Sequence, residues 1–362
     1  MKIRQVVVTG KNQVELQNLD LDESKLGADE ILIETERTVI SAGTELANYT
    51  AADPTVFTKG AWNAYPWKSG YGNVGIVRAV GGSGQTGAAK NPFVDKQAGG
   101  KEIPVAIGDR VFTFGPHSSH FIYSTRRLIV PVSAGVSLNE AAAARMGHVA
   151  LTALDVASSP TGKWVVVFGL GLVGNLAAQL FRIAGAHVIG VDPAEKRRAL
   201  ARECGIPRTV TGSDDEVIAQ IKQITDGKMA AISVDAVGHS TICMSCLKIT
   251  ASFGELIILG SPRVDVQGNL TDVFRPSHLR WITIKGALEW AQPQYPQMDN
   301  ENSSLGKMQK IFGWLCDGRL QLKPLISHVL PPTQIKQAYN GLLNEKDNYT
   351  GVVLDWRNEI GS

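Results

Sequence analysis

Three glycines and one aspartate have the spacing of a dinucleotide-binding turn. Residues 165–174 read V-V-V-F-G-L-G-L-V-G, so Gly169, Gly171 and Gly174 form Gly-x-Gly-x-x-Gly directly after an apolar run, and Asp192 closes the next apolar run, 18 residues after Gly174. In such a turn the first glycine permits a tight bend, the second lets the backbone approach a pyrophosphate, and the third lets the following helix pack closely. The free N–H groups and the dipole at the start of that helix favour phosphate groups. The sequence therefore predicts a dinucleotide site.

Asp192 also bears on which dinucleotide binds. A carboxylate there can accept a hydrogen bond from a ribose 2′-hydroxyl and would repel a 2′-phosphate, so NAD(H) is favoured over NADP(H). Arg197 and Arg198 keep NADP(H) open as the weaker alternative, because guanidinium groups suit a 2′-phosphate. These arginines could instead be a solvated helix start, and Arg197 could stack on the adenine of NAD. For the glycines, the alternative is an ordinary turn, against which the flanking strand, helix and acid argue.

The composition excludes several classes of partner. The chain has 362 residues, a net charge of +2, 44% hydrophobic and 19% charged residues, which fits two globular domains. Basic residues cluster only in pairs, so nucleic acid is not an expected partner. No apolar stretch approaches the roughly 20 residues that cross a bilayer, and the start of the chain lacks the apolar core of a signal peptide, so we expect a cytoplasmic protein with no membrane partner. Four cysteines are expected to be free thiols; Cys243-x-x-Cys246 could be a redox or metal pair, but packing is favoured because no second pair occurs.

The elements that must position these residues fall into two groups. The first 130 residues predict short strands broken by glycine and thus a small, partly open β-barrel. These strands are expected at residues 3–9, 14–19, 30–40, 75–80, 110–114 and 120–131, with an exposed loop at 81–104. An alanine-rich helix from Ser137 leads to helical residues 151–157, after which strands and helices alternate, as in a doubly wound parallel sheet. Its strands are expected at residues 163–169, 187–192, 209–211, 231–237, 255–260 and 282–286, with a helix at 172–184 after the glycine turn. A helix at 304–317 and a strand at 351–356 that returns to the first domain end the pattern.

Two motifs accompany this order of a β-barrel, a parallel sheet and a returning tail: V-I-S-A-G-T-E at residues 39–45 and V-D-A-V-G at 234–238. Together they resemble the medium-chain dehydrogenase/reductase superfamily. The resemblance implies an α/β protein with a GroES-like β-barrel catalytic domain (1–149 and 287–362) and a Rossmann dinucleotide-binding domain (150–286). It also implies further cofactor contacts beside the glycines, Asp192 and Arg197. These are Thr152, Leu172, Val173, Val237, Gly260 and Ser261.

The chain departs from the zinc alcohol dehydrogenases of that superfamily at the metal ligands. Where they have a cysteine before a Gly-Thr-Asp turn this chain has Ala42, and where they have Gly-His-Glu it has Gly-Tyr71-Gly. Their third ligand, four residues before a cofactor-touching threonine, matches His148. One imidazole cannot hold a catalytic zinc, and no cysteine precedes Cys204 to form the family's structural-zinc lobe. The resemblance is therefore to a zinc-independent member with no metal.

Without a metal, side chains must handle the proton of an alcohol. His148 and Tyr71 occupy vacated ligand positions, and histidine titrates near neutral pH, so we rank His148 first as the acid/base, Tyr71 second and Thr44, which matches the family's proton-relay hydroxyl, third. Glu45 could orient His148 or act directly. The structural alternatives are that His148 fills space at a domain junction, that Tyr71 plugs the vacated metal position, and that Thr44 and Glu45 only start a helix.

The substrate is expected to be a small molecule. Zinc-less relatives with a Ser-Ala-Gly-Thr-Glu turn include proteins similar to the bacteriochlorophyllide hydroxyethyl dehydrogenases and to sugar or cyclitol dehydrogenases, which implies a polar secondary alcohol on a ring. Aromatic residues that could stack on such a ring, or simply pack the barrel and a dimer surface, are Phe57, Trp62, Tyr65, Trp67, Tyr71, Trp290 and Tyr295. His117 and His120 are interpreted as structural. The superfamily also implies a homodimer joined at the edge strand 281–286.

Two other functions stay open. An NADPH-dependent quinone or enoyl reductase is one, because many zinc-less members of the superfamily reduce activated double bonds. A non-catalytic NAD(H)-binding protein, either a redox sensor or a structural protein, is the other. Retention of the polar groups of Thr44, Tyr71 and His148 weighs against the second.

Overall fold

The computed structural model describes residues 1–82, 88–90, 104–297 and 302–359, and the chain forms two units. The first unit contains Met1–Arg145, Gln292–Asp317 and Ile326–Ser362, and the second contains Met146–Ala291 and Gly318–Leu325. The segment Gly318–Leu325 was expected in the catalytic domain and instead belongs to the second unit. The side-chain amide of Gln179 explains this, because it donates to the Gln321 carbonyl at 2.9 Å and accepts from the Gln321 N–H at 2.8 Å.

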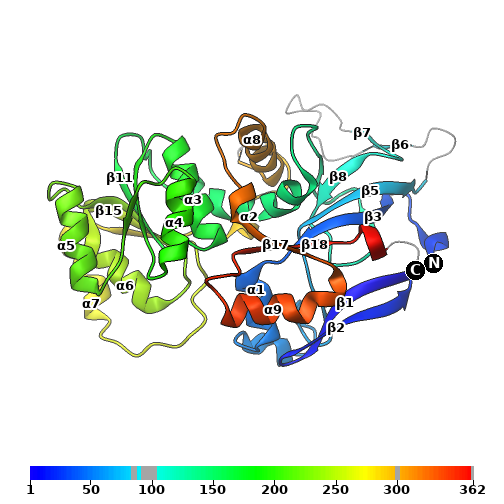
Figure 1. The fold of residues 1–362 in the computed structure, drawn as a ribbon, viewed down its shortest axis with the longest axis horizontal. Helices are drawn as coiled ribbons and strands as arrows, with labels where there is room; N and C mark the ends of the chain where they lie inside the picture. The colour runs from blue at the N-terminus through cyan, green and yellow to red at the C-terminus, as the bar shows by residue number, and fades with distance from the viewer. Residues whose placement is uncertain (83–87, 91–103, 298–301, 360–362) are drawn as a thin grey trace. The chain divides into compact units, whose positions relative to one another are not determined.

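The first unit is built mainly from antiparallel strands (Figure 1). A three-stranded sheet has the order β2-β1-β4, and a seven-stranded sheet has the order β10-β8-β5-β3-β18-β17 with β9 also paired to β3. The strands are β1 (Lys2–Gly10), β2 (Gln13–Asp20), β3 (Glu30–Val39), β4 (Trp67–Lys68), β5 (Asn73–Val80), β8 (Arg110–Thr113), β9 (His120–Ser124), β10 (Ile129–Pro131), β17 (Ile326–Leu330) and β18 (Gly351–Asp355). The chain's last strand, β18, pairs with β3 and places Val353 opposite Val39. The tail therefore returns to the first unit, as predicted.

Two local expectations in the first unit were wrong. Residues 120–131 form two strands instead of one, because the polar Thr125–Arg127 makes a turn in which the Arg127 N–H donates to the Ser124 carbonyl at 3.1 Å. The expected loop at 81–104 contains β6 (Ala88–Lys90), which pairs with β7 (Pro104–Ala106). The rest of that loop, residues 83–87 and 91–103, lies outside the described residues.

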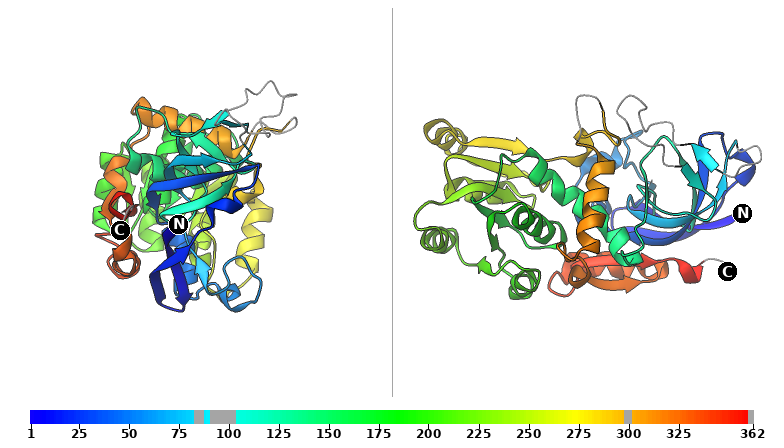
Figure 2. Two further views of the ribbon diagram at one scale, coloured as in Figure 1. Left: turned by 90° about the vertical axis from the view of Figure 1, so that its right-hand side faces the viewer. Right: turned by 90° about the horizontal axis from the view of Figure 1, so that it is seen from above.

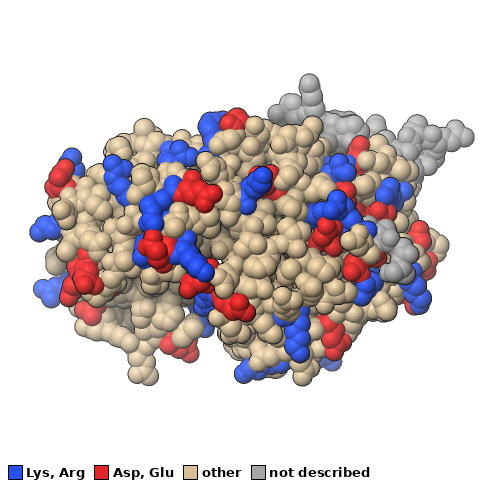
Figure 3. Space-filling model, viewed as in Figure 1, with Lys and Arg blue, Asp and Glu red and all other residues tan. Residues whose placement is uncertain are grey.

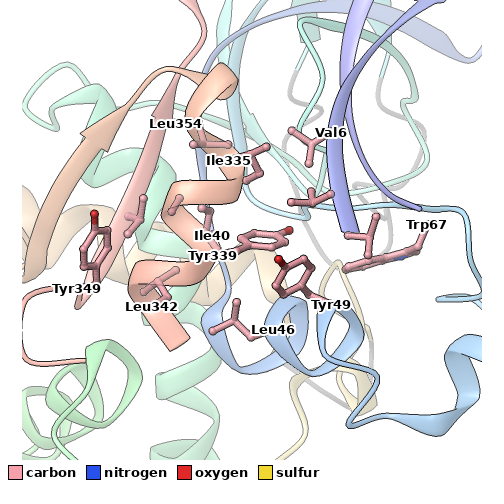
Figure 4. Close-up of a cluster of buried hydrophobic side chains, with 14 of the residues drawn as sticks. Val6, Ile40, Leu46, Tyr49, Trp67, Ile335, Tyr339, Leu342, Tyr349 and Leu354 are labelled. Carbon is pink, nitrogen blue, oxygen red and sulfur yellow. The ribbon is translucent and has the colours of Figure 1, made fainter. Parts of the chain in front are cut away.

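One core of the first unit joins both ends of the chain (Figure 4). Helix α9 (Ile335–Asn344) contributes Ile335, Tyr339 and Leu342, at the spacing that places side chains on one helix face. They pack with residues of β1, of β18 and of α1 (Ala42–Tyr49), and Figure 4 shows Tyr339 between Ile40 and Tyr49. Helix α9 was not predicted. Helix α8 (Ser304–Cys316) lies where a helix was expected.

The second unit is a parallel sheet with helices on both faces (Figures 1 and 2). Its strand order is β13-β12-β11-β14-β15-β16. The chain adds β12 and β13 on one side of β11 and then returns to add β14, β15 and β16 on the other side. The strands are β11 (Trp164–Phe168), β12 (His187–Val191), β13 (Arg208–Val210), β14 (Ala230–Asp235), β15 (Thr250–Ile258) and β16 (Thr283–Gly286). The helices are α3 (Leu172–Ile183), α4 (Glu195–Glu203), α5 (Asp214–Ile224), α6 (Ser240–Ile249) and α7 (Thr271–Arg280). The predicted α/β class, with a doubly wound parallel sheet and a separate β domain, is confirmed.

The chain passes from the first unit to the second within α2 (Leu138–Val156), where the alanine-rich helix was expected. On the face drawn in Figure 3, basic and acidic side chains are interspersed, with no broad area of one sign. Among the described residues, no helix is long and apolar enough to span a bilayer.

Candidate functional site

The glycine turn in the second unit has the geometry that its sequence predicts. Gly169 has φ 87°, a conformation that favours glycine, and its N–H donates to the Val191 carbonyl at 2.8 Å. A Cβ on Gly174 would lie 1.8 Å from the Gly169 carbonyl oxygen, so helix α3 can approach the turn only without a side chain there. A Cβ on Gly171, at the N-cap of α3, would meet nothing within 4 Å. The space beside Gly171 and the N–H groups at the start of α3 can take an anionic group.

Asp192 lies at the end of β12, next to this turn. Its side chain is buried, with Oδ2 accepting from the Leu170 N–H and Oδ1 from the Ala194 N–H, both at 2.8 Å. Each carboxylate oxygen has a second lone pair, so the group can still accept a hydrogen bond from a hydroxyl. The two backbone bonds hold the carboxylate beside the turn before any ligand arrives.

The two arginines that kept NADP(H) open differ in the structure. The Arg198 guanidinium donates to the Asp192 and Pro193 carbonyls at 2.6 and 2.8 Å and to Glu195, so it fixes the start of α4. The Arg197 guanidinium lies 3.7 Å from Asp192 Oδ2 and its side chain is partly exposed. Only Arg197 remains placed to meet a 2′-phosphate.

The turns after β14 and β15 lie against each other in the second unit. Asp235 Oδ1 accepts from the N–H groups of Val237 and Gly238 at 2.8 and 3.1 Å. A Cβ on Gly260 would lie 2.2 Å from the Gly238 nitrogen, so these two turns approach closely. This brings the expected contacts Val237 and Gly260 together, followed by the exposed Ser261, at the carboxyl edge of the sheet where ligands of such sheets bind.

The Cys243 thiol donates to Asp235 Oδ2 at 3.3 Å. Burial raises its pKa to about 12 and raises the pKa of Cys246 well above its usual range. Protonated, buried thiols are poor nucleophiles and poor metal ligands, which agrees with packing as the role of this pair.

The candidate catalytic residues are divided between the units. His148 and Thr152 lie one turn apart on α2 in the second unit, both buried, and the Thr152 hydroxyl donates to the His148 carbonyl at 3.4 Å. Tyr71, Thr44 and Glu45 belong to the first unit. There the Tyr71 hydroxyl donates to the Ser41 hydroxyl and lies 3.2 Å from Thr44 Oγ1, so Tyr71 and Thr44 are brought together.

Glu45 is fully buried and fully engaged inside the first unit. Its Oε1 accepts from the Ser41 N–H at 2.8 Å, and its Oε2 accepts from the Tyr339 hydroxyl at 2.7 Å and lies 3.0 Å from His117 Nε2. These contacts hold α1, His117 and Tyr339 together. The expected roles of Glu45, as a group that orients His148 or acts directly, stay predictions. The alternative that Glu45 belongs to a helix start agrees with its place in the first turn of α1.

Sequence reasoning missed two partners of these residues. His117 was treated as a structural histidine, and its fully buried imidazole has Nε2 within hydrogen-bond distance of Glu45 Oε2, at 3.0 Å. Arg145 was not singled out, and its guanidinium stacks over the Tyr71 ring, 4.6 Å from the centroid. An arginine inside an alanine-rich apolar helix was the available signal, because a buried cation needs a specific partner.

The aromatic residues proposed for substrate stacking separate into two kinds. Phe57 and Trp62 are exposed, with edge-on contacts to Tyr65 and Trp67 respectively. Tyr295 is buried, and its hydroxyl donates to the Arg127 carbonyl at 2.8 Å, so it packs the first unit.

The residues at the family's zinc positions do not fit zinc. Ala42 has no donor atom, and the Tyr71 hydroxyl is bound to other hydroxyls. Within the part of the chain that the structure describes, no group of three or more His, Cys, Asp or Glu side chains could hold a metal ion.

Several known proteins are similar to this chain. Residues 173–303 match the family described as zinc-binding dehydrogenase. This stretch of the chain is similar to the zinc-binding dehydrogenases. It is 25% identical over 334 residues to D-guloside 3-dehydrogenase of Escherichia coli strain K12, covering 89% of this chain and 91% of that protein. It is 29% identical over 190 residues to L-threonine 3-dehydrogenase of Caldanaerobacter subterraneus, where the match spans 49% of this chain and only about half (47%) of that protein.

The fold of these dehydrogenases covers the whole chain. An alcohol dehydrogenase structure from Thermotoga maritima superposes with a TM-score of 0.77 at 20% sequence identity, covering 98% of this chain and 99% of that one. The proteins that this chain resembles thus include dehydrogenases named for threonine and for a guloside, and its fold is that of the alcohol dehydrogenase structure.

Proposed function

We propose that this chain is an NAD(H)-dependent oxidoreductase that interconverts a secondary alcohol and a ketone without a metal ion. The observation that carries the proposal is the Asp192 carboxylate, fixed by two backbone N–H groups beside the glycine turn. A preformed acceptor at that place suits a ribose hydroxyl, and its negative charge disfavours a 2′-phosphate. The dehydrogenase names of the relatives support the reaction class.

The chain's own residues divide the work. The turn Gly169–Gly174 would hold the pyrophosphate and Asp192 the adenine ribose. When bound, NAD⁺ supplies an acceptor for hydride. Tyr71 and His148 are the candidate proton acceptors, and Thr44, 3.2 Å from the Tyr71 hydroxyl, can pass the proton on.

A polar ring is the proposed substrate class. Phe57 and Trp62 expose flat apolar faces in the first unit, and aromatic faces stack well on sugar-like rings. A relative that aligns over 91% of its length is named for a guloside, a sugar derivative, which supports the same class.

A homodimer is proposed for the second unit. β16 is an edge strand of the parallel sheet, and large apolar side chains are exposed on its neighbour β15, on α7 and just before β16: Phe253, Phe274, Leu279 and Trp281. An unpaired edge with exposed apolar neighbours suits pairing with a second copy. We keep the cytoplasm as the proposed location.

Arg197 favours a second candidate, an NADPH-dependent quinone or enoyl reductase, because its guanidinium lies near Asp192 and is partly exposed. A non-catalytic NAD(H)-binding protein is the third.

Fluorescence titration with NADH and NADPH, followed by a coupled screen of polyols, inositols, glycosides, quinones and enals, separates these candidates. We expect NADH to bind at least about tenfold more tightly, with turnover on a ring alcohol and less than about a tenth of a zinc per chain by elemental analysis. Tighter NADPH binding with turnover on quinones or enals would establish the second candidate. Saturation by NADH with no turnover on any compound would establish the third. Stoichiometric zinc would overturn the metal-free mechanism.

A further inference from the structure

A buried arginine stacks on the candidate acid/base Tyr71. Arg145, in α2, is fully buried, and its guanidinium carbon lies 4.6 Å from the Tyr71 ring centroid and 4.8 Å from that of Phe114. Gly72 makes room for it, because a Cβ there would lie 2.9 Å from Arg145 Cβ and 3.0 Å from its Cγ. The sequence Gly-Tyr71-Gly thus places the phenol and leaves space for the cation.

We propose that Arg145 is a positioning residue that supplies a fixed positive charge to Tyr71, so that the phenol of Tyr71 can ionise and serve as the acid/base of the reaction. This rests on the proposed function and assigns the proton transfer within it. A guanidinium stays protonated at all relevant pH values and stabilises a phenolate more than a phenol. The charge that zinc supplies in metal-dependent relatives is supplied here by a side chain.

The other groups that face Tyr71 are compatible with an ionised phenol. The hydroxyls of Ser41 and Thr44 lie within hydrogen-bond distance of its oxygen, and each can turn to donate a proton. Glu45, the nearest acid on α1, contacts the Ser41 N–H and not Tyr71, and His117 and Tyr339 both partner its carboxylate. Its opposing charge is therefore partly offset.

A second arginine–tyrosine stack in the same unit differs from the Tyr71 stack in the surroundings of the tyrosine hydroxyl. Arg127 lies over Tyr123 at 4.6 Å, but the Tyr123 hydroxyl is fully buried and donates to the Leu128 carbonyl at 3.1 Å. Burial raises the pKa of Tyr123 well above its usual range. Tyr71 is only partly buried and its hydroxyl lies against the hydroxyls of Ser41 and Thr44, so the stacked cation can favour the charged form.

The proton and electron balance is simple in the oxidation direction. The Tyr71 phenolate oxygen takes the proton of the substrate hydroxyl, and the C–H bond of the same carbon breaks with its electron pair leaving as hydride to the nicotinamide of NAD⁺. The alcohol is oxidised to a ketone and NAD⁺ is reduced to NADH. The phenol so formed returns its proton to water through the hydroxyls of Ser41 and Thr44.

The test is an ultraviolet titration of tyrosine ionisation in the protein without cofactor. The positive charge of Arg145 stabilises the phenolate more than the phenol, so wild type should contain one tyrosine that titrates below the usual range of tyrosine, and Tyr71→Phe should lack it. Arg145→Met should move that step up into the usual range, and Arg145→Lys should leave it in between. Tyr123→Phe, the matched control, should leave it unchanged.

Identical titrations of wild type and Tyr71→Phe below pH 10 would overturn the proposal, even if Arg145→Met failed to fold. A low step that survives in Arg145→Met, with folding confirmed by circular dichroism, would overturn it as well. Because no cofactor or substrate is present, the titration is independent of the proposed function. In an active enzyme, the pH profile of turnover should shift with the same step across the Arg145 variants.

Discussion

Tyr339→Phe removes a hydroxyl that donates a hydrogen bond to Glu45, a buried acid of the first unit. That hydroxyl donates to Glu45 Oε2 at 2.7 Å and lies 3.2 Å from Ser69 Oγ, and all three side chains are buried. A hydrogen bond to a charged group contributes about 1.5–3 kcal/mol, and its loss leaves a buried carboxylate oxygen short of a donor. We therefore expect the free energy of unfolding to fall by roughly 2–3 kcal/mol.

Tyr49→Phe is the matched control for this change. The two rings lie in the same core with centroids 5.1 Å apart, and both are buried. The Tyr49 hydroxyl is 3.5 Å from Asn340 Oδ1, at the limit of a hydrogen bond, so its loss should cost less than about 1 kcal/mol. The same atom is deleted from the same kind of site, and only its partner differs.

Urea unfolding, followed by the fluorescence of tryptophans such as Trp356 in that core, measures both variants. The midpoint should fall markedly for Tyr339→Phe and little for Tyr49→Phe, with unchanged denaturant dependence. Burial and the Glu45 carboxylate raise the pKa of Tyr339 well above its usual range, so the hydroxyl stays a donor and the difference should persist at alkaline pH. Equal losses in the two variants would refute the reasoning, because Glu45 would then not depend on this donor.

Four further predictions concern the cofactor turn, the acid/base and the sheet edge. Gly174→Ala should prevent the second unit from folding stably, because its Cβ would lie 1.8 Å from a backbone oxygen, whereas Gly171→Ala should keep the melting temperature and weaken NADH binding at least about tenfold in a fluorescence titration. Asp192→Asn should reduce the preference for NADH over NADPH by about tenfold in the same titration, because it removes the charge that repels a 2′-phosphate. His148→Ala tests the competing assignment of the acid/base, because a loss of turnover of about a hundredfold with NADH affinity unchanged would place the proton transfer on its imidazole and not on Tyr71. Trp281→Asp should convert a dimer to a monomer by light scattering, since Trp281 is 72% exposed beside the edge strand.

Each of these has an outcome that contradicts it. Wild-type NADH affinity in Gly171→Ala would mean that no phosphate approaches the turn, and an unchanged cofactor preference in Asp192→Asn would mean that another group selects the cofactor. Unchanged turnover in His148→Ala would reduce that residue to packing. A monomeric wild-type protein would remove the proposed dimer and the edge strand's role in it.

Much of the fold could be predicted because its signals are local. Strands β11 and β12 are apolar runs that a buried sheet requires, and β11, β12, β13 and β14 are each followed by a helix within a few residues. The misplaced elements had weak or conflicting signals. Helix α9 is short, and its buried apolar residues pack against β1, β18 and α1, which are distant in the sequence or separated by a turn. Strand β6 lies in a stretch of glycine and polar residues, and its pairing with β7 is a tertiary contact.

The sequence by itself determined the glycine turn, because the spacing of its glycines and the acid after the next strand are set within one β-α-β unit. In such a unit the neighbouring parallel strands β11 and β12 bring the turns that follow them together. Only the tertiary structure decided the partners of the first unit's polar groups. Glu45 meets His117 across 72 positions and Tyr339 across 294. Arg145 contacts Tyr71 from helix α2, which begins only at Leu138. Such pairs follow from which strands and helices pack together, and no spacing along the chain specifies them.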